Sequence, residues 1–258
     1  MLSILVKFPI FKRLVPSLML KFLKLLRKNR GFFKVNNFNM FLDILDPIDK
    51  EIIISQEFEK DEFEFLLKNI HLYKIRNFID IGANCGYYSL FVTKSNAQIK
   101  TFAFEPNQEA CHKFRRSLKK NLLISKRIKL YNFGLSEKNS KLKMKSVIKN
   151  GYAQTGGSSV EGTFKKHNFK INIENFFRGD EKIVFKNKIL AIKIDVEGHE
   201  LSVLKGLKNL IEKNKCIIQI EIFKKNFKLV NKFLNSRKYK VFKKFEKKPN
   251  FFYKNFIK

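Results

Sequence analysis

Four polar side chains follow one apolar stretch closely enough to share a site. The stretch ILAIKID, residues 189–195, ends at Asp195, and Glu197, His199 and Glu200 come directly after it. Carboxylates and an imidazole are side chains that take up and release protons near neutral pH. We therefore interpret Asp195, Glu197 and His199 as candidate catalytic residues. Structural roles are also open: a lysine partner for Glu197, a packing role for His199 and a helix cap for Glu200.

A glycine turn forms a second candidate site in the stretch NFIDIGANCGYYSL, residues 77–90. Its first half suits a buried parallel strand, and Gly82 and Gly86 bracket a tight turn into an amphipathic helix. Such a turn exposes backbone N–H groups at a helix N-terminus, where an anionic or polar ligand can bind. The pattern D-x-G-x-N-x-G therefore predicts a cofactor turn that runs from Asp80 through Asn84 to Gly86.

Glu105 lies at a position where nucleotide-binding folds commonly carry an acidic residue. Residues 100–105, KTFAFE, form a predicted strand that ends at Glu105, and Pro106 stops it. Glu105 lies 23 residues after Gly82, close to the roughly 20-residue spacing that places an acid on ribose hydroxyls. The spacing predicts a ribose-bearing ligand, because a carboxylate can accept from two vicinal hydroxyls. The alternative is a strand-end acid in water.

Strands and helices alternate around these motifs. The predicted strands cover residues 78–81, 100–105, 127–133, 189–195 and 216–223, and the predicted helices cover about 57–72, 108–120, 200–212 and 225–235. Two further strands, 239–245 and 250–257, form a terminal hairpin. This order predicts an α/β fold, with a mostly parallel sheet, an antiparallel hairpin and helices on both faces. Ligands of such sheets bind at the carboxyl ends of the strands.

Three other segments are less regular. Residues 38–54 suit a short hairpin or strand pair, and residues 141–148 suit a further strand. The stretch GYAQTGGSSVEG, residues 151–162, is rich in glycine and hydroxyl side chains. It is explained equally well as a mobile lid over a pocket and as an ordinary exposed connection.

Three motifs in this order resemble the FkbM family of S-adenosylmethionine-dependent methyltransferases: FIDIGANCGYYSL, FAFEPN and AIKIDVEGHELSVLKG. The resemblance covers roughly residues 46–223 and implies a class I methyltransferase (Rossmann-like) fold with a seven-stranded sheet. It implies S-adenosyl-L-methionine as the cofactor. The implied cofactor-binding residues are Asp80, Gly82, Asn84, Gly86, Glu105 on the ribose, Asn107, and Asn132 near the adenine.

The resemblance also implies a reaction. Family members are similar to O-methyltransferases that act on hydroxyls of sugars and natural products, so a saccharide or related acceptor is expected. A hydroxyl is a poor nucleophile until its proton is removed, which favours Asp195 or Glu197 as a general base, with His199 as the alternative. Clustered acids can bind Mg²⁺, but their spacing does not require it, and no metal is predicted. The general methyltransferase motif has glycine at Asn84, whereas GAN is the usual form in this family.

The formal net charge of +31 raises two alternatives, an RNA methyltransferase and a non-catalytic polyanion- or membrane-binding protein. Of the 54 basic residues, 45 are lysines spread along the chain, and arginine is scarce. RNA recognition favours arginine and aromatic stacking surfaces, so nucleic acid is disfavoured as a partner. A compositional bias toward lysine explains the charge at least as well.

A nicotinamide dehydrogenase, which shares this kind of fold, is disfavoured because the turn G-A-N-C-G lacks the G-x-G-x-x-G motif of those enzymes.

The charge distribution suggests the domain organisation. Residues 1–38 carry nine basic residues and no acid, and form a predicted basic amphipathic extension. Residues 39–258 form the predicted methyltransferase domain, with a lead-in (39–76), a motif-bearing core (77–223) and a basic helix with the terminal hairpin (224–258).

The three cysteines lack metal-ligand spacing, which favours reduced, buried thiols in a cytoplasmic protein.

The N-terminal extension favours two interpretations. In residues 17–28, leucines alternate with lysines at helical spacing. This pattern suits a helix on an anionic membrane surface, and equally a helix packed on the domain. The first interpretation gives peripheral contact at the inner face of the membrane through residues 1–35.

Vesicle sedimentation distinguishes the two interpretations. If the extension binds lipid, full-length protein is expected to sediment with phosphatidylserine-containing vesicles, and a deletion of residues 1–35 is expected to lose this, because it removes the basic amphipathic segment. Equal binding by both proteins would remove the membrane hypothesis.

Overall fold

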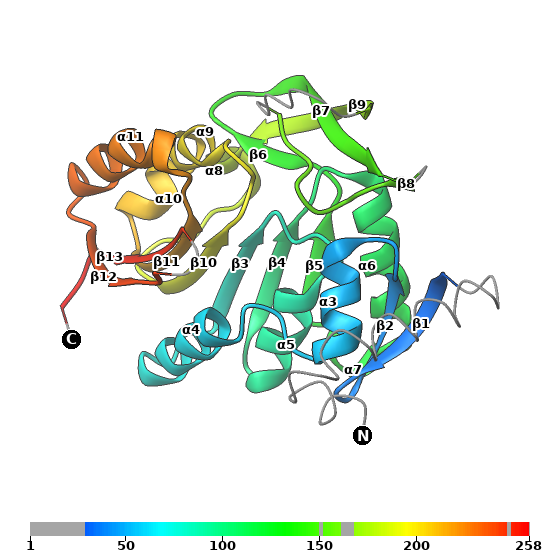
Figure 1. The fold of residues 1–258 in the computed structure, drawn as a ribbon. Coiled ribbons are helices and arrows are strands. Elements are labelled where there is room, and N and C mark those ends of the chain that lie inside the picture. The colour runs from blue at the N-terminus through cyan, green and yellow to red at the C-terminus, as the bar shows by residue number, and fades with distance from the viewer. Residues whose placement is uncertain (1–28, 150–151, 161–167, 247–248, 258) are drawn as a thin grey trace.

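The computed structural model describes residues 29–149, 152–160, 168–246 and 249–257. A seven-stranded sheet forms its centre, in the order β12-β13-β11-β10-β3-β4-β5 (Figure 1). The strands are β3 (Asn77–Ile81), β4 (Lys100–Phe104), β5 (Ile128–Tyr131), β10 (Ile189–Ile194), β11 (Lys215–Glu221), β12 (Lys240–Lys244) and β13 (Asn250–Lys254). Only β13 runs antiparallel to its neighbours, β11 and β12. The predicted fold class is confirmed, including its C-terminal hairpin.

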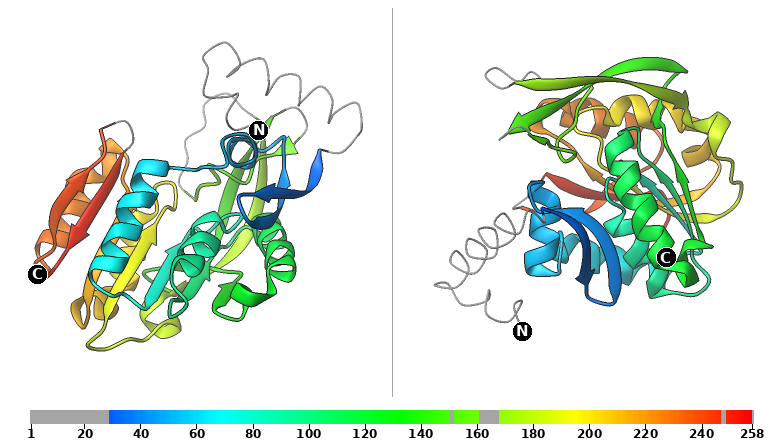
Figure 2. Two further views of the ribbon diagram at one scale, coloured as in Figure 1. Left: turned by 90° about the horizontal axis from the view of Figure 1, so that it is seen from below. Right: turned by 90° about the vertical axis from the view of Figure 1, so that its right-hand side faces the viewer.

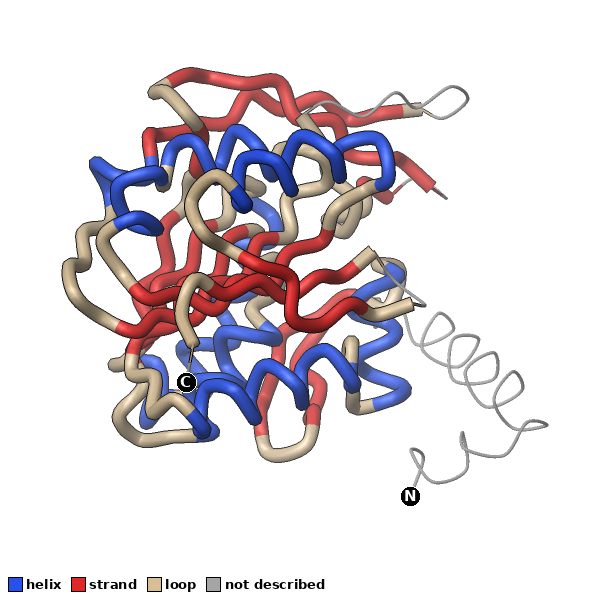
Figure 3. The backbone as a smooth tube through the Cα atoms, turned by 90° about the vertical axis from the view of Figure 1, so that its left-hand side faces the viewer, coloured by secondary structure: helices blue, strands red, loops and turns tan. Residues whose placement is uncertain are grey.

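Helices cover both faces of this sheet (Figures 2 and 3). They are α4 (Lys60–Leu72), α5 (Tyr87–Ser95), α6 (Gln108–Lys120), α7 (Leu122–Ser125), α8 (Gly179–Lys182), α9 (Glu200–Gly206), α10 (Lys208–Glu212) and α11 (Lys224–Asn235). Alternate side chains of β3 enter different apolar clusters. Phe78 packs with α4 and α5, whereas Ile79 and Ile81 pack with α9, α10 and α11. Burial on both faces explains why this strand reads as a nearly continuous apolar run.

A second, smaller sheet is inserted between β5 and β10. It has the order β6-β9-β7-β8 and lies beyond the carboxyl ends of β3 and β4 (Figure 1). Its strands are β6 (Gly134–Ser136), β7 (Ser140–Lys149), β8 (Tyr152–Ala153) and β9 (Phe169–Arg178). The strand expected at residues 141–148 is confirmed. Its partner β9 was not predicted, and the strand expected at 127–133 ends earlier, as β5, with β6 starting at the next turn.

The hairpin expected over residues 38–54 is wrong in extent. Strand β2 (Phe38–Asp43) pairs with β1 (Arg30–Val35), while α3 (Pro47–Ser55) occupies the second half of the segment. Asp46 starts this helix, because its side chain accepts a 3.1 Å hydrogen bond from the Ile48 N–H and Pro47 suits the first helical position. The β1–β2 hairpin crosses the predicted boundary at residue 38, and β2 packs against α6 (Figure 2).

Three further predictions concern a helix, the cysteines and the N-terminal extension. The helix expected at 200–212 is divided at Leu207 into α9 and α10. All three cysteines are buried and free. The helix expected at residues 17–28 lies outside the described residues, and within them no helix is long and apolar enough to cross a bilayer.

Candidate active site

The turn between β3 and α5, residues 82–86, lies against the ends of two neighbouring strands. The N–H groups of Gly82 and Ala83 donate to the Phe104 carbonyl, at 2.9 and 3.2 Å. Gly82 has φ +83°, and a Cβ added there would stand 1.8 Å from the Asp195 carbonyl oxygen. Asn84 also has a positive φ, +48°, which asparagine tolerates better than most residues. Glycine at 82 therefore lets this turn approach the turn that follows β10.

Glu105 fixes the same turn from the end of β4. Its Oε2 accepts a 2.8 Å hydrogen bond from the Asn84 N–H, and its Oε1 accepts another of 2.8 Å from the Asn107 N–H. Burial raises the pKa of Glu105 to about 7. Each carboxylate oxygen has two lone pairs, so each retains an acceptor position for a ligand hydroxyl.

The turn after β10, residues 195–200, carries the predicted catalytic acids. Asp195 Oδ2 accepts a 2.8 Å bond from the buried ammonium of Lys193. Burial acts to lower the pKa of Lys193, but the charges of Asp195, Glu59 and Asp80 overcome it and raise that pKa. Lys193 therefore stays charged beside the acids.

Glu197 occupies the strained position of this turn, with φ +51°. Burial, with the neighbouring charge of Asp195, raises the pKa of Glu197 to about 7. Its backbone carbonyl accepts a 2.8 Å bond from the Ser159 hydroxyl, which ties the turn to the inserted sheet. A non-glycine residue held in the left-handed region is a feature often found at functional sites.

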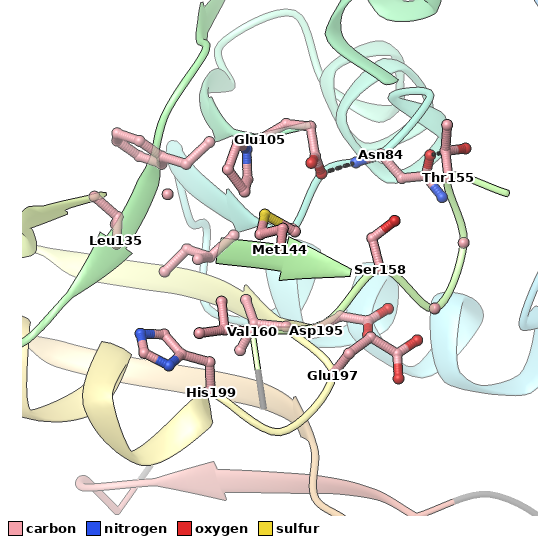
Figure 4. Close-up of a pocket in the computed structure, with 18 of the residues that line it drawn as sticks. Asn84, Glu105, Leu135, Met144, Thr155, Ser158, Val160, Asp195, Glu197 and His199 are labelled. Atoms are coloured by element: carbon pink, nitrogen blue, oxygen red, sulfur yellow. Dashed lines mark hydrogen bonds between the residues drawn. The ribbon is translucent and has the colours of Figure 1, made fainter. Parts of the chain in front are cut away.

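His199 and Glu200 have partners on other sides of the turn. The His199 Nε2 lies 3.0 Å from the Ser136 hydroxyl, and its ring packs edge-to-face on Phe176. Figure 4 shows this ring directed away from the carboxylate of Glu197. Glu200 Oε1 accepts a 2.6 Å bond from the Gly198 N–H in the turn before α9. This contact braces the turn, because Gly198 lies outside the helix, which begins at Glu200.

One pocket of about 650 Å³, including its open mouth, joins these turns. It is lined by the predicted residues Gly82, Asn84, Glu105, Asp195, Glu197 and His199. A neighbouring cavity of about 350 Å³ shares Gly82, Asn84 and Asp195 and is also lined by Asp80 and Lys193. Asp80 is buried there and accepts a 2.6 Å bond from the Ser89 hydroxyl, while its Oδ1 has no hydrogen-bond partner among the described residues. The two cavities meet at the cofactor turn.

Three predicted cofactor residues do not line either cavity. Gly86 (φ +87°) starts α5 against Phe114, where an added Cβ would stand 2.3 Å from the ring. Asn107 caps α6 through bonds of 2.9 and 3.1 Å to its Oδ1. Asn132 donates to the carbonyls of Glu105 and Pro106, both at 3.1 Å. These residues hold the turns in place, and their direct contact with a cofactor stays a prediction.

The inserted sheet supplies a wall of the pocket that the sequence motifs did not predict. We call residues 154–160 the strap; with Met144 and Phe176 it closes one side of the pocket (Figure 4). The strap is anchored by Asp46 Oδ2, which accepts from the N–H and hydroxyl of Thr155 at 2.8 and 2.7 Å. The strap lies at the pocket, as the lid interpretation expects, and is not an ordinary exposed connection; its mobility stays a prediction. In the sequence, the only sign of this wall was the high content of glycine and hydroxyl side chains in residues 151–162. Among the described residues no cluster could hold a metal ion.

The strand order and the turns at the carboxyl ends of β3, β4 and β10 define a class I methyltransferase architecture. The chain belongs to the methyltransferase FkbM domain family, whose model matches residues 80–241. The predicted family is confirmed.

Individual relatives are distant. The methyltransferase sdnD of Sordaria araneosa is 28% identical over 182 residues, covering 57% of this chain and 70% of that protein. The solved FkbM methyltransferase of Methylobacillus flagellatus has a TM-score of 0.49 and 16% identity, covering 80% of this chain and 59% of that one. This chain therefore spans about three fifths of that protein's length. An S-adenosylmethionine-dependent O-methyltransferase from Thermotoga maritima has a TM-score of 0.47 and 12% identity, covering 82% of this chain and 71% of that one.

The raised pKa of Glu105 predicts a pH-dependent stability. The folded protein keeps a proton that the unfolded chain releases near pH 4.5, so stability from this group is complete below that pH and is lost as the pH rises toward about 7. Urea unfolding between pH 5 and 7 should show this as a slope of about 1.4 kcal/mol per pH unit that Glu105→Gln removes.

A matched control is Glu137→Gln, an exposed carboxyl paired with Lys205. This variant should retain the wild-type slope. Identical slopes for wild type and Glu105→Gln would contradict the prediction.

Proposed function

We propose that this protein is an S-adenosylmethionine-dependent methyltransferase that transfers a methyl group to a hydroxyl of a saccharide or related glycan. Membership of the FkbM family supports methyl transfer. The acceptor assignment depends on the position of Glu197, whose half-buried carboxylate, with a pKa raised to about 7, lines the same pocket as the cofactor turn.

The residues present fit a nucleoside cofactor with an amino-acid end. Gly82 lets the turn that carries Asn84 lie against the Asp195 carbonyl, and Glu105 offers acceptor positions suited to ribose hydroxyls. The neighbouring cavity adds the buried carboxylate of Asp80 and the ammonium of Lys193, which can pair with an ammonium and a carboxylate. When bound, S-adenosylmethionine supplies an electrophilic methyl group on a sulfonium.

Glu197 is the best-placed general base of the three predicted candidates. A base is most effective when its pKa lies near the working pH, and burial brings Glu197 there. Asp195 is already engaged by the ammonium of Lys193 at 2.8 Å. His199 is engaged by Ser136 and packed on Phe176. In the proposed mechanism, Glu197 takes the acceptor's proton while Asp195 orients the hydroxyl.

The charge around the acceptor side favours a neutral, polyhydroxylated substrate. Glu221 lies close enough to Asp195 and Glu197 for their charges, added to burial, to raise its pKa to about 8. Carboxylates accept hydrogen bonds from sugar hydroxyls but repel phosphodiesters. This local acidity, within a strongly basic protein, supports a saccharide over RNA as the acceptor.

Donor binding is the first measurement. Isothermal titration calorimetry of the full-length protein should detect S-adenosylmethionine and not NAD. Glu105→Gln is expected to weaken that binding about tenfold or more, because a neutral amide loses one hydroxyl acceptor and the charge. Absence of binding by the wild type would overturn the proposed function.

The base is tested by transfer of a labelled methyl group to a panel of free and lipid-linked glycans. Glu197→Gln should lower kcat about 10²- to 10⁴-fold with little change in donor affinity. Wild-type kcat should rise as the pH increases through about 7, because Glu197 must be ionised to accept the proton. Asp195→Asn should lower kcat as well, whereas Glu137→Gln should leave it unchanged. Undiminished turnover in both the Glu197 and Asp195 variants would contradict this mechanism.

A further inference from the structure

A fully buried lysine connects three segments around the cofactor turn. Lys113 of α6 has a side-chain exposure of 0%, and its ammonium lies 2.6 Å from Asp49 Oδ2 and 3.6 Å from Asp46 Oδ2. It also donates a 2.9 Å hydrogen bond to the Thr155 hydroxyl. Asp46 and Asp49 belong to the N-terminal lead-in, and Thr155 belongs to the strap. This lysine therefore joins the lead-in, α6 and the strap at one point.

Burial makes this arrangement specific. Removing one partner from a buried charge cluster leaves an uncompensated charge, which costs far more than an exposed pair would. Burial acts to raise the pKa of Asp46, but Lys113 and the hydrogen bonds from Thr155 overcome it and hold the pKa below its ordinary value. Asp46 is therefore a strong, charged acceptor for Thr155.

The Thr155 hydroxyl lies within hydrogen-bond distance of two acceptor groups but has only one proton to donate. Its Oγ1 lies 2.7 Å from Asp46 Oδ2 and 3.2 Å from the side-chain oxygen, Oδ1, of Asn84. A hydroxyl donates one proton, and the shorter, charge-assisted bond to Asp46 uses it. The contact with Asn84 is then satisfied only if the amide NH₂ donates to Oγ1, which is equivalent to turning the nearly symmetrical amide by 180°.

This orientation determines what Asn84 presents to a ligand. With its NH₂ directed at Thr155, its carbonyl oxygen faces the other way, and Asn84 lines both cavities of the site. Figure 4 shows Asn84 and Thr155 facing each other at one end of the pocket. Within the described ranges the Asn84 side-chain amide has no second hydrogen-bond partner.

We propose that Lys113 and Thr155 are positioning residues that turn the Asn84 amide so that its carbonyl oxygen accepts a hydrogen bond from the α-ammonium of the bound donor. This inference rests on the proposed function, since it assumes a donor with an amino-acid end. Lys113 orients the Thr155 hydroxyl by donating to it, Asp46 takes the hydroxyl proton, and Asn84 is left with one allowed orientation. The lysine touches no ligand itself.

The test compares two ligands that differ in the amino-acid end. S-Adenosylhomocysteine has it, whereas 5′-methylthioadenosine keeps the nucleoside and the thioether without it. By calorimetry, Thr155→Val is expected to weaken S-adenosylhomocysteine about tenfold and to leave 5′-methylthioadenosine unchanged. Valine has nearly the shape of threonine without its hydroxyl, and the Lys113–Asp49 pair remains intact.

Two further variants complete the design. Thr155→Ser keeps the hydroxyl and should bind both ligands as the wild type does. Asn84→Gly keeps the positive φ accessible while removing the amide, so it should reproduce the selective loss even if Thr155→Val does not fold.

The outcomes separate this inference from the proposed function. Equal weakening of both ligands would show that the strap acts only on the shape of the pocket, and no weakening of either would show that the amide orientation is irrelevant; each result overturns the inference. Failure of the wild type to bind S-adenosylmethionine or S-adenosylhomocysteine would instead overturn the proposed function, and the inference with it.

Discussion

The site depends on one close backbone approach between two neighbouring strands. Strands β3 and β10 pair in parallel, and the ladder continues past Ile81 through a 3.0 Å bond from the Asp195 N–H. Both turns therefore leave the sheet side by side, and a side chain at residue 82 would collide with the Asp195 carbonyl. Because the cofactor turn and the turn at residues 195–200 follow adjacent strands, their polar side chains line one pocket at the same edge of the sheet.

The candidate site is acidic, although the chain as a whole is strongly basic. The protein carries a net charge of +31, yet its site concentrates carboxylates around one buried lysine. Burial raises the pKa of Glu105, Glu197 and Glu221 into the range of about 7 to 8. The rest of the fold offsets the free energy that desolvation of these acids costs. Their raised pKa values let them exchange protons near neutral pH.

Local motifs were sufficient to predict the sheet and its two principal turns. Gly82, Glu105 and Asp195 each lie within a few residues of a strand end. A run of apolar residues followed by a polar turn marks such an end in the sequence, so these residues could be predicted. The parallel ladder then brings them together by topology alone. The division of 200–212 at Leu207 and the helix at 47–55 were missed, because short helices depend on caps and packing more than on period.

The remaining parts of the site depend on long-range contacts that no local pattern contains. Asp46 and Thr155 are 109 residues apart in the sequence, and Lys113 reaches Asp49 across 64. In a chain with 45 lysines, nothing in the composition distinguishes Lys113, whose side chain is fully buried. Such a charge cluster is weak as a source of stability, because desolvation offsets most of the attraction. Its value lies in geometry: each buried charge admits few arrangements of its partners, so the strap and the cofactor turn are held in one relative position. The lead-in is therefore part of the site, because Ile48 lines the pocket and Asp46 anchors the strap.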